Sequence, residues 1–318
     1  MRKAALLYNP DSGGRGRRRL KDLESALALL RNAGVEAGLV PTESRHHAGD
    51  EVRQAVAAGC DTIFACGGDG TIHNIAQVLA NTHVALAILP MGTANALAHD
   101  LGVPTSLKAA AEAALRGKPK RIALGCARYR KLDGSAGQRY FLIATGVGMD
   151  AHLFYKLHSG DKQRLGMAAY YAKAWNMWFT YPMTRFVVEY EENSSGALKS
   201  ASVTELLNVR IRNFGGVVQE LAPGASLERN DMRIVYARTA SRLAYLAYVT
   251  RGLLRRRWTI PGVDLAHTAK VSCRYAESEA RGAEQPKVYV EADGELLGTL
   301  PVEMTTVPDA LTLLAPAN

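Results

Sequence analysis

Hydrophobic and polar positions follow two alternating patterns over the first 120 residues. Short apolar runs typical of buried strands are each followed by a segment in which apolar residues recur every three or four positions, as on one face of a helix. We expect strands at 4–8, 35–40, 63–66 and 84–89, and helices at about 17–32, 48–58 and from about 70 onward. This alternation predicts a mostly parallel sheet with helices on both faces.

The pattern changes after Pro119, where apolar and polar residues begin to alternate with a period of two between turn residues. Such runs predict a second domain made of antiparallel strands, arranged as a β-sandwich. We place the boundary near residue 121, giving domains 1–121 and 122–305, and expect residues of about 306–318 to pack back on the first. The expected strands are 121–129, 139–145, 185–190, 203–212, 232–237, 269–275, 287–292 and 310–314.

The most informative motif is Gly67-Gly68-Asp69-Gly70-Thr71, between the strand at 63–66 and the helix after it. Glycines let the main chain approach a phosphate closely, and the N–H groups at a helix N-terminus attract anions. Asp69 would repel a phosphate unless it holds a metal ion or orients a hydroxyl. Taken alone, the motif is equally compatible with a plain turn.

Polar and glycine-rich clusters follow all four strands expected in the first domain, at 9–14, 42–47, 67–71 and 92–95. The carboxyl ends of parallel strands meet at one edge of the sheet, where α/β proteins bind their ligands. Four clusters at one edge favour a nucleotide-binding site over an accidental turn.

These clusters together resemble the diacylglycerol kinase catalytic-domain family, whose members phosphorylate lipids. The resemblance runs from Asn9-Pro10 through the glycine motif to Gly92-Thr93-Ala94-Asn95, and continues in Gly146–Ala151 and Asp293-Gly294-Glu295. It implies a Rossmann-like first domain of the NAD-kinase and diacylglycerol-kinase type, and a β-sandwich second domain.

The resemblance also implies ATP and Mg²⁺ as cofactors and assigns site residues. Glu295 is expected to be the base that takes the proton of the lipid hydroxyl, with Asp293 beside it and Asp69 as the third catalytic carboxylate. An Asp-Gly pair is otherwise the usual signal of a type I′ hairpin turn, and both readings can hold. The expected ATP-binding residues are Asn9, Pro10, Ser12, Gly13, Thr42, His47, Gly67, Gly68, Asp69, Gly70, Thr71, Gly92, Thr93 and Asn95.

Several positions depart from the family pattern. The family usually has Asn-Glu where this chain has His73-Asn74, and often an Asp at the position of Ala96. Some bacterial members also hold a structural magnesium ion in the second domain, for which the candidate ligands here are Leu227, Asn230 and Met232. Asn230 stands where a carboxylate is expected, and an amide oxygen is a weaker ligand for Mg²⁺. We therefore do not expect this second metal site to be filled.

Composition limits the cellular locations that we expect for the protein. The chain has 318 residues, 47% of them apolar, and no run of 18 apolar residues that would predict a membrane span. The apolar stretch before Asn9 is too short for a signal peptide. The four cysteines show no metal-ligand spacing, as expected of reduced thiols in a cytoplasmic protein.

The net charge of +9 favours anionic partners. We expect the lipid substrate to be met at an anionic membrane surface, by a cytoplasmic and peripherally attached protein that can form a homodimer and does not bind nucleic acid. An arginine-rich helix expected at 241–257 could lie on such a surface or face water. An aromatic helix expected at 166–179 could line a lipid cleft, although ordinary core packing explains it more simply.

The main hypothesis is therefore a lipid kinase that transfers the γ-phosphate of Mg-ATP to a lipid hydroxyl, the lipid being diacylglycerol-like or sphingoid. An NAD kinase shares the Gly-Gly-Asp-Gly-Thr loop. It usually has an acidic residue at the position that Asn74 occupies in this chain, after His73. A nucleotide-binding regulator without catalysis is the third hypothesis. Retention of Asp69, Asp293 and Glu295 argues against it.

Overall fold

The structure is a computed structural model, and it describes residues 1–10, 16–42, 48–149, 151–152, 182–215, 220–254, 258–276 and 286–316. The chain divides into two compact units. Unit 1 comprises Met1–Leu124, Asn213–Gly216 and Val307–Asn318, and unit 2 comprises Gly125–Arg212 and Val217–Thr306. The first unit is thus built from both ends of the chain.

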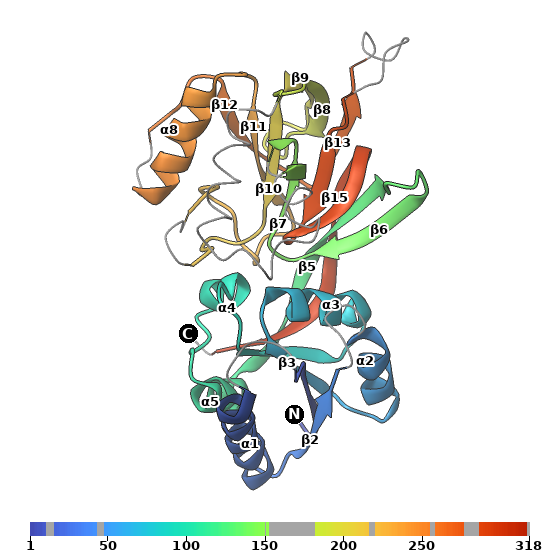
Figure 1. Cartoon of the computed structure of the whole chain (residues 1–318), viewed down its shortest axis with the longest axis vertical. Coiled ribbons are helices and arrows are strands. Elements are labelled where there is room, and N and C mark those ends of the chain that lie inside the picture. Colours follow the sequence, from blue (N-terminus) through green and yellow to red (C-terminus); the bar gives the residue numbers. More distant parts are fainter. Residues whose placement is uncertain are drawn as a thin grey trace. The chain divides into compact units, whose positions relative to one another are not determined.

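Unit 1 is an α/β sandwich around a parallel sheet, shown in the blue and teal part of Figure 1. The strand order is β15-β4-β3-β1-β2, in which only the last part of β15 belongs to this unit, and all neighbours are parallel. Its elements are β1 (Lys3–Tyr8), α1 (Gly16–Asn32), β2 (Glu36–Pro41), α2 (Ala48–Ala57), β3 (Thr62–Gly67), α3 (Asp69–Leu79), β4 (Ala85–Pro90), α4 (Ala96–Asp100), α5 (Leu107–Arg116) and the end of β15 (Glu295–Ala315).

The central strands of this sheet are buried on both faces, because helices cover each side. β3 and β4 are buried along their whole length. Alternate strand residues, such as Leu6, Phe64 and Leu89, form one core with apolar side chains of α1 and α5. Helices α2 and α3 pack against each other and against β1 and β3. The continuous apolar runs in the sequence are thus those of a doubly covered parallel sheet.

Unit 2 is built from antiparallel strands. One row of paired strands runs β12-β11-β10-β7-β14-β15, and another runs β15-β13-β8-β9, with β6 paired to β5. The elements are β5 (Lys118–Arg130, shared with unit 1), β6 (Ala136–Phe141), β7 (Ala144–Val147), β8 (Phe186–Glu191), β9 (Leu198–Val203), β10 (Glu205–Val209), β11 (Met232–Ala237), α8 (Arg242–Leu253), β12 (Val263–Thr268), β13 (Lys270–Tyr275), β14 (Tyr289–Ala292) and β15.

Strand β15 belongs to both rows of unit 2. It pairs with β14 through Glu295–Thr299 and then with β13 through Val302–Thr305. Buried side chains from both rows, including Phe141, Phe186 and Met304, meet in a single apolar core. The alternation of period two seen in the sequence is the inward and outward alternation of these strands.

The fold class predicted from the sequence is confirmed, with local differences in the strands. The expected strand at 139–145 is interrupted at Leu142 and Ile143, whose N–H groups bind a side chain instead of a neighbouring strand. Strands β9 and β12 and the first half of β15 were not predicted. The aromatic helix expected at 166–179 lies outside the described residues.

Candidate active site

The carboxyl ends of four parallel strands lie level with one another in unit 1. Tyr8 at the end of β1 is in register with Pro41 of β2 and Cys66 of β3, and Gly67 is in register with Pro90 of β4. The residues that follow these strands are therefore brought to one edge of the sheet. The structure in this way unites the ends that carry Asn9, Thr42, Gly68 and Gly92, as the sequence predicted.

The glycine loop connects the buried strand β3 directly to the N-terminus of α3. Gly68 is the N-cap residue of α3, with extended dihedrals (φ −93°, ψ −173°), and its carbonyl accepts hydrogen bonds from the N–H groups of Thr71 and Ile72. A Cβ on Gly67 would lie 2.4 Å from the hydroxyl of Thr71. Only glycine fits there, which explains the Gly67…Thr71 pair.

The loop after β4 packs directly on the glycine loop. A Cβ on Gly92 would lie 2.5 Å from the Cα of Gly68, and a Cβ on Gly68 would lie 3.2 Å from the Cα of Gly92. The N–H of Met91 donates a hydrogen bond to the carbonyl of Gly67 at 2.9 Å. Two stretches of main chain with no side chain between them form a surface on which N–H groups can reach a phosphate.

Asn95 closes this second loop on itself. Its side-chain oxygen accepts from the N–H of Gly92, and its side-chain amide donates to the carbonyl of Gly92, both at 2.9 Å. Asn95 itself adopts the left-handed conformation (φ 48°), which Asn tolerates better than most residues. Its side chain thus shapes the loop.

Asp69 is the first residue of α3 and the one acid in the glycine motif. Its Oδ1 atom is buried and has no hydrogen-bond partner among the described residues. A buried carboxylate oxygen without a partner is costly unless a ligand supplies a cation or a donor. Such an anionic oxygen is the kind of atom that Mg²⁺ prefers, so the residues present fit a magnesium ion at this edge.

The remaining predicted nucleotide residues divide into two groups. Thr42 is buried, and both its N–H and its hydroxyl donate to the carbonyl of Tyr8, at 2.8 and 3.3 Å, so it ties β2 to β1. Asn9 is buried, whereas Pro10, Gly70 and Thr93 are exposed. Ser12, Gly13 and His47 lie outside the described residues.

The Asp293-Gly294 pair forms the hairpin turn between β14 and β15 in unit 2. Both residues have positive φ values, 50° and 82°, as a type I′ turn requires. The Asp293 carboxylate accepts three main-chain hydrogen bonds, from Leu142 at 2.8 Å, Ile143 at 2.8 Å and Ala144 at 3.0 Å. These bonds cover the break between β6 and β7 and fasten the hairpin to it.

Glu295 stands two residues further along and makes a different contact. Its Oε2 atom lies 2.7 Å from a guanidinium nitrogen of Arg139 on β6, and both side chains are about a quarter exposed (25% and 21%). Arg139 was not among the predicted site residues. The sequence predicted a strand that starts at residue 139, but no signal in it linked Arg139 to Glu295.

Two further buried acids in unit 2 hold turns in place. The Glu205 carboxylate accepts the N–H of Met149 at 2.6 Å, next to Gly148 with φ 118°. Glu291 accepts the N–H of Gly294 at 2.9 Å, which closes the hairpin turn. In the sequence, Gly146–Ala151 is part of the family resemblance, but nothing signals the acidic partner that lies 56 residues after Met149.

Two of the three candidate ligands of the second metal site, Leu227 and Met232, could reach a cation only through their main-chain carbonyl oxygens. Asn230 is exposed, and Leu227 and Met232 have apolar side chains that are buried. The neighbouring Asp231 carboxylate is held by the guanidinium of Arg229, at 2.6 and 2.5 Å. No group of three or more His, Cys, Asp or Glu side chains suited to a metal occurs in the part of the chain that the structure describes. The arginine neutralises the carboxylate that would otherwise be nearest to a cation here.

Comparison with known proteins agrees with this arrangement. Residues 3–127 match the family described as "Diacylglycerol kinase catalytic domain". The chain is 27% identical to the diacylglycerol kinase of Bacillus subtilis (strain 168) over 310 residues, 96% of this chain and 94% of that protein. It is 29% identical to the diacylglycerol kinase of Mycobacterium tuberculosis (strain H37Rv) over 318 residues, 99% of this chain and 96% of that protein.

Solved structures show the same fold. A putative diacylglycerol kinase from Bacillus anthracis (strain Sterne) aligns with a TM-score of 0.73 at 19% identity, covering 99% of this chain and 95% of that one. Yeast NADH kinase aligns with a TM-score of 0.52 at 10% identity, covering 99% of this chain and 84% of that one. At these identities both structures support the fold alone.

The parallel sheet of unit 1 and the antiparallel strands of unit 2 form the fold of these diacylglycerol kinase and NADH kinase structures. The resemblance predicted from the motifs is confirmed: residues 3–127 match the diacylglycerol kinase catalytic domain, and the chain is similar to diacylglycerol kinases over nearly its whole length. In the described part of the chain, no helix is both long enough and apolar enough to span a bilayer.

Proposed function

We propose that this protein is a lipid kinase, which transfers the γ-phosphate of ATP to a hydroxyl group of a lipid. The observation that carries the proposal is the buried and unpartnered Oδ1 atom of Asp69, located at a helix N-terminus on the edge where four parallel strands of unit 1 end. An anionic oxygen beside an anion-binding loop suits a nucleotide that brings its own cation.

ATP would bind through main-chain groups of the glycine loops. The close approach of Gly68 and Gly92 leaves the backbone uncovered by side chains, and the N-terminus of α3 adds its positive end. Asn95 holds the second loop in shape through its two bonds to Gly92. We assign Thr42 a positioning role, because its hydroxyl already donates to Tyr8.

Mg²⁺ is the second expected cofactor, and Asp69 is the residue that fits it in unit 1. A magnesium ion would neutralise charge on the phosphates of ATP when bound. The departures at Asn74 and Ala96 leave Asp69 as the acid of this motif, so the ion would depend on one carboxylate and on the phosphates themselves. We assign no ion to the region of Asp231, where Arg229 already supplies a positive charge.

We propose Glu295 as the base that removes the proton of the lipid hydroxyl. Its carboxylate is partly exposed and is oriented by Arg139. Asp293 suits a positioning role, because three main-chain N–H groups already occupy its two oxygens. Phosphoryl transfer asks mainly for alignment of the two reactants and neutralisation of charge, and the anion-binding loop of unit 1 suits the second of these tasks.

The acceptor is proposed to be a lipid of the diacylglycerol type, since the chain matches two proteins named diacylglycerol kinase over nearly their whole length. A sphingoid lipid is the alternative within the same chemistry. The setting we propose is the cytoplasmic face of an anionic membrane, with peripheral attachment and no nucleic acid as partner. Self-association as a homodimer is compatible with this setting and is not required by it.

An acceptor screen tests the proposal. The purified protein is incubated with ATP labelled in the γ-phosphate, Mg²⁺ and, separately, diacylglycerol, ceramide, sphingosine, phosphatidylglycerol or NAD. We expect label in a lipid product. Label in NADP instead would identify an NAD kinase, and ATP binding without any labelled product would favour a nucleotide-binding regulator.

A further inference from the structure

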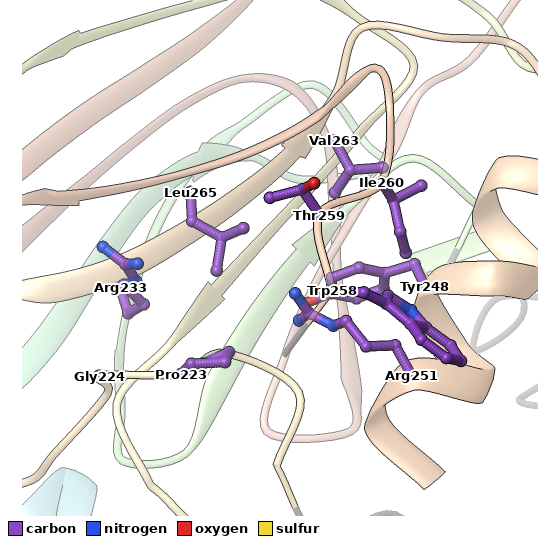
Figure 2. A pocket seen from close by; sticks show the side chains of 10 residues that line it. All are labelled: Pro223, Gly224, Arg233, Tyr248, Arg251, Trp258, Thr259, Ile260, Val263 and Leu265. Carbon is purple, nitrogen blue, oxygen red and sulfur yellow. The ribbon is translucent and has the colours of Figure 1, made fainter. Parts of the chain in front are cut away.

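Unit 2 contains a pocket that the kinase proposal does not use. Its volume is about 420 Å³, and it lies between β11, helix α8 and the segment that leads into β12. Figure 2 shows Arg233 from β11 and Arg251 from α8 on opposite sides of this space, with Trp258 and Tyr248 beside Arg251. No acidic residue lines it among the residues that the structure describes, so its lining carries two positive charges.

Arg233 is the member of this pocket that most needs a ligand. Its Nε atom is buried and has no hydrogen-bond partner within the described residues. Burial lowers the pKa of Arg233 below its ordinary value, so the charge is held at a cost. The nearby Asp231 carboxylate does not compensate it directly, because Arg229 and Asn193 occupy that carboxylate at 2.5–2.8 Å. A partly buried guanidinium whose Nε has no partner calls for an anionic one.

Arg251 is held in position for the same task. It is only 6% exposed, its guanidinium carbon lies 4.5 Å from the centre of the Tyr248 ring, and it donates to the carbonyl of Leu221 at 3.2 Å. A guanidinium has five N–H donors, so this one bond leaves several for a ligand. A second arginine with a fixed orientation adds geometric selectivity for an oxyanion with several oxygens.

The surface beside the pocket is apolar. Leu243 and Leu246 of α8 are 77% and 43% exposed, Leu254 just beyond the helix is 56% exposed, and Trp258 at the pocket is 46% exposed. At about 100° per residue, the three leucines share one face of the helix, Arg251 lies beside that face, and Tyr248 lies near the opposite face. Apolar groups that face water next to a cationic pocket match an amphiphile, which has an anionic head and apolar chains.

We propose that this pocket binds the phosphate of an anionic phospholipid headgroup, while the leucine face of α8 and Trp258 lie in the membrane interface. Guanidinium groups bind phosphate through paired, charge-assisted hydrogen bonds, and tryptophan favours the level of the headgroups. The site lies wholly in unit 2 and serves attachment to the membrane, so it stands whether or not the chain is a kinase.

The test is vesicle binding in the absence of nucleotide. Phosphatidylcholine vesicles with and without phosphatidylglycerol are sedimented with wild-type protein, Arg233→Gln, and Arg274→Gln as the matched control. Arg274 lies on β13, is 44% exposed and pairs with Glu189 outside the pocket, so its replacement removes the same charge elsewhere. We expect Arg233→Gln to weaken binding to phosphatidylglycerol vesicles about fivefold, the scale of one basic residue at a charged membrane. Arg274→Gln should bind as the wild type does.

Two further variants keep the test sound if Arg233→Gln is poorly folded. Arg233→Lys keeps the charge and should retain most of the binding. Thr259→Glu adds a carboxylate at an exposed position of the pocket and should weaken binding as Arg233→Gln does. Equal losses in Arg233→Gln and Arg274→Gln, or undiminished binding in both Arg233→Gln and Thr259→Glu, would overturn the proposal.

The fluorescence of Trp258 distinguishes binding of a lipid from binding of a soluble phosphate. The chain has three tryptophans, and replacing Trp175 and Trp178 by Phe leaves Trp258 as the single reporter at the pocket. We expect its fluorescence to shift to shorter wavelength with phosphatidylglycerol vesicles and to change little with glycerol phosphate or inorganic phosphate. An equal response to the soluble phosphates would assign the pocket to a soluble ligand and overturn the lipid assignment.

Discussion

Asp293 and Glu295 flank Gly294 at the same hairpin, yet their carboxylates have different partners. Asp293 accepts three main-chain N–H groups at the break between β6 and β7, whereas Glu295 pairs with the side chain of Arg139 at 2.7 Å. The first carboxylate fixes the turn to its neighbouring strands. The second remains partly exposed at the start of β15 and is the better candidate for chemistry.

Substitution of these two acids should therefore have different consequences. Asp293→Asn loses acceptors for buried main-chain N–H groups, and we expect the free energy of unfolding to fall by about 2 kcal/mol. Glu295→Gln keeps the shape and should unfold within about 0.5 kcal/mol of the wild type while losing turnover. Denaturant unfolding and a kinase assay on both variants check this. Loss of stability in Glu295→Gln alone would contradict the assignment of roles.

Asp69→Asn tests the carboxylate of the glycine motif. Because its Oδ1 is buried without a partner, the amide should fold normally but lose charge for a cation. We expect kcat to fall by about a hundredfold, the usual scale for losing one charge-stabilising group, and the requirement for Mg²⁺ to rise. Asp61→Asn is the matched control, since Asp61 lies in the same unit and its carboxylate bonds only Arg2 and Thr62 among the contacts described. A wild-type rate in Asp69→Asn would remove it from the site.

Gly92→Ala tests the contact between the two glycine loops. Its Cβ would lie 2.5 Å from the Cα of Gly68 and 2.8 Å from the side-chain oxygen of Asn95, so the loops must separate. Overpacking of this kind costs about 1–3 kcal/mol, and ATP binding should weaken along with stability. Gly70→Ala meets nothing within 4 Å and should leave the unfolding midpoint unchanged or slightly raised. Calorimetric ATP binding and denaturant unfolding separate the two variants.

His267 should make the stability of unit 2 depend on pH. Burial, helped by Arg233, lowers the pKa of His267 below 6.5, although Asp231 at 3.4 Å opposes this shift. The folded chain then binds a proton less readily than the unfolded chain. This contribution to stability is complete above pH 6.5 and is lost as the pH falls below it.

We expect His267→Gln to flatten the fall of unfolding free energy between about pH 7 and about pH 5. His83→Gln, at an exposed position of unit 1, should keep the wild-type slope. A parallel slope in His267→Gln and wild type would show that another group titrates. Asp231 does not interfere in this range: burial raises the pKa of its carboxyl, but the bonds from Arg229 and Asn193 outweigh burial and lower it below 3.8.

The first unit could be read from the sequence because its signals are local. Each strand ends in a turn motif, and the strands are buried on both faces, so continuous apolar runs and glycines mark their ends. The position of Gly68 against Gly92 follows from two neighbouring parallel strands that both end in glycine loops. The same logic predicted the type I′ turn at Asp293-Gly294.

The partners within the second unit could not be read in the same way, because they join distant parts of the chain. Asp293 meets Ile143 across 150 residues, and Glu205 meets Met149 across 56. Arg229 beside Asp231 was visible in the sequence, but only the structure shows that its guanidinium takes up the carboxylate at the candidate metal site. Antiparallel pairing order depends on such non-local contacts and not on local propensity.

The most direct measurement of the central claim is transfer of labelled γ-phosphate from ATP to diacylglycerol in mixed micelles, for wild type, Glu295→Gln and Asp69→Asn side by side. We expect labelled phosphatidate from the wild type, little or none from the two variants, and ATP binding retained by Glu295→Gln. Absence of any phosphorylated lipid from folded, ATP-binding wild-type protein, or equal product from all three, would contradict it.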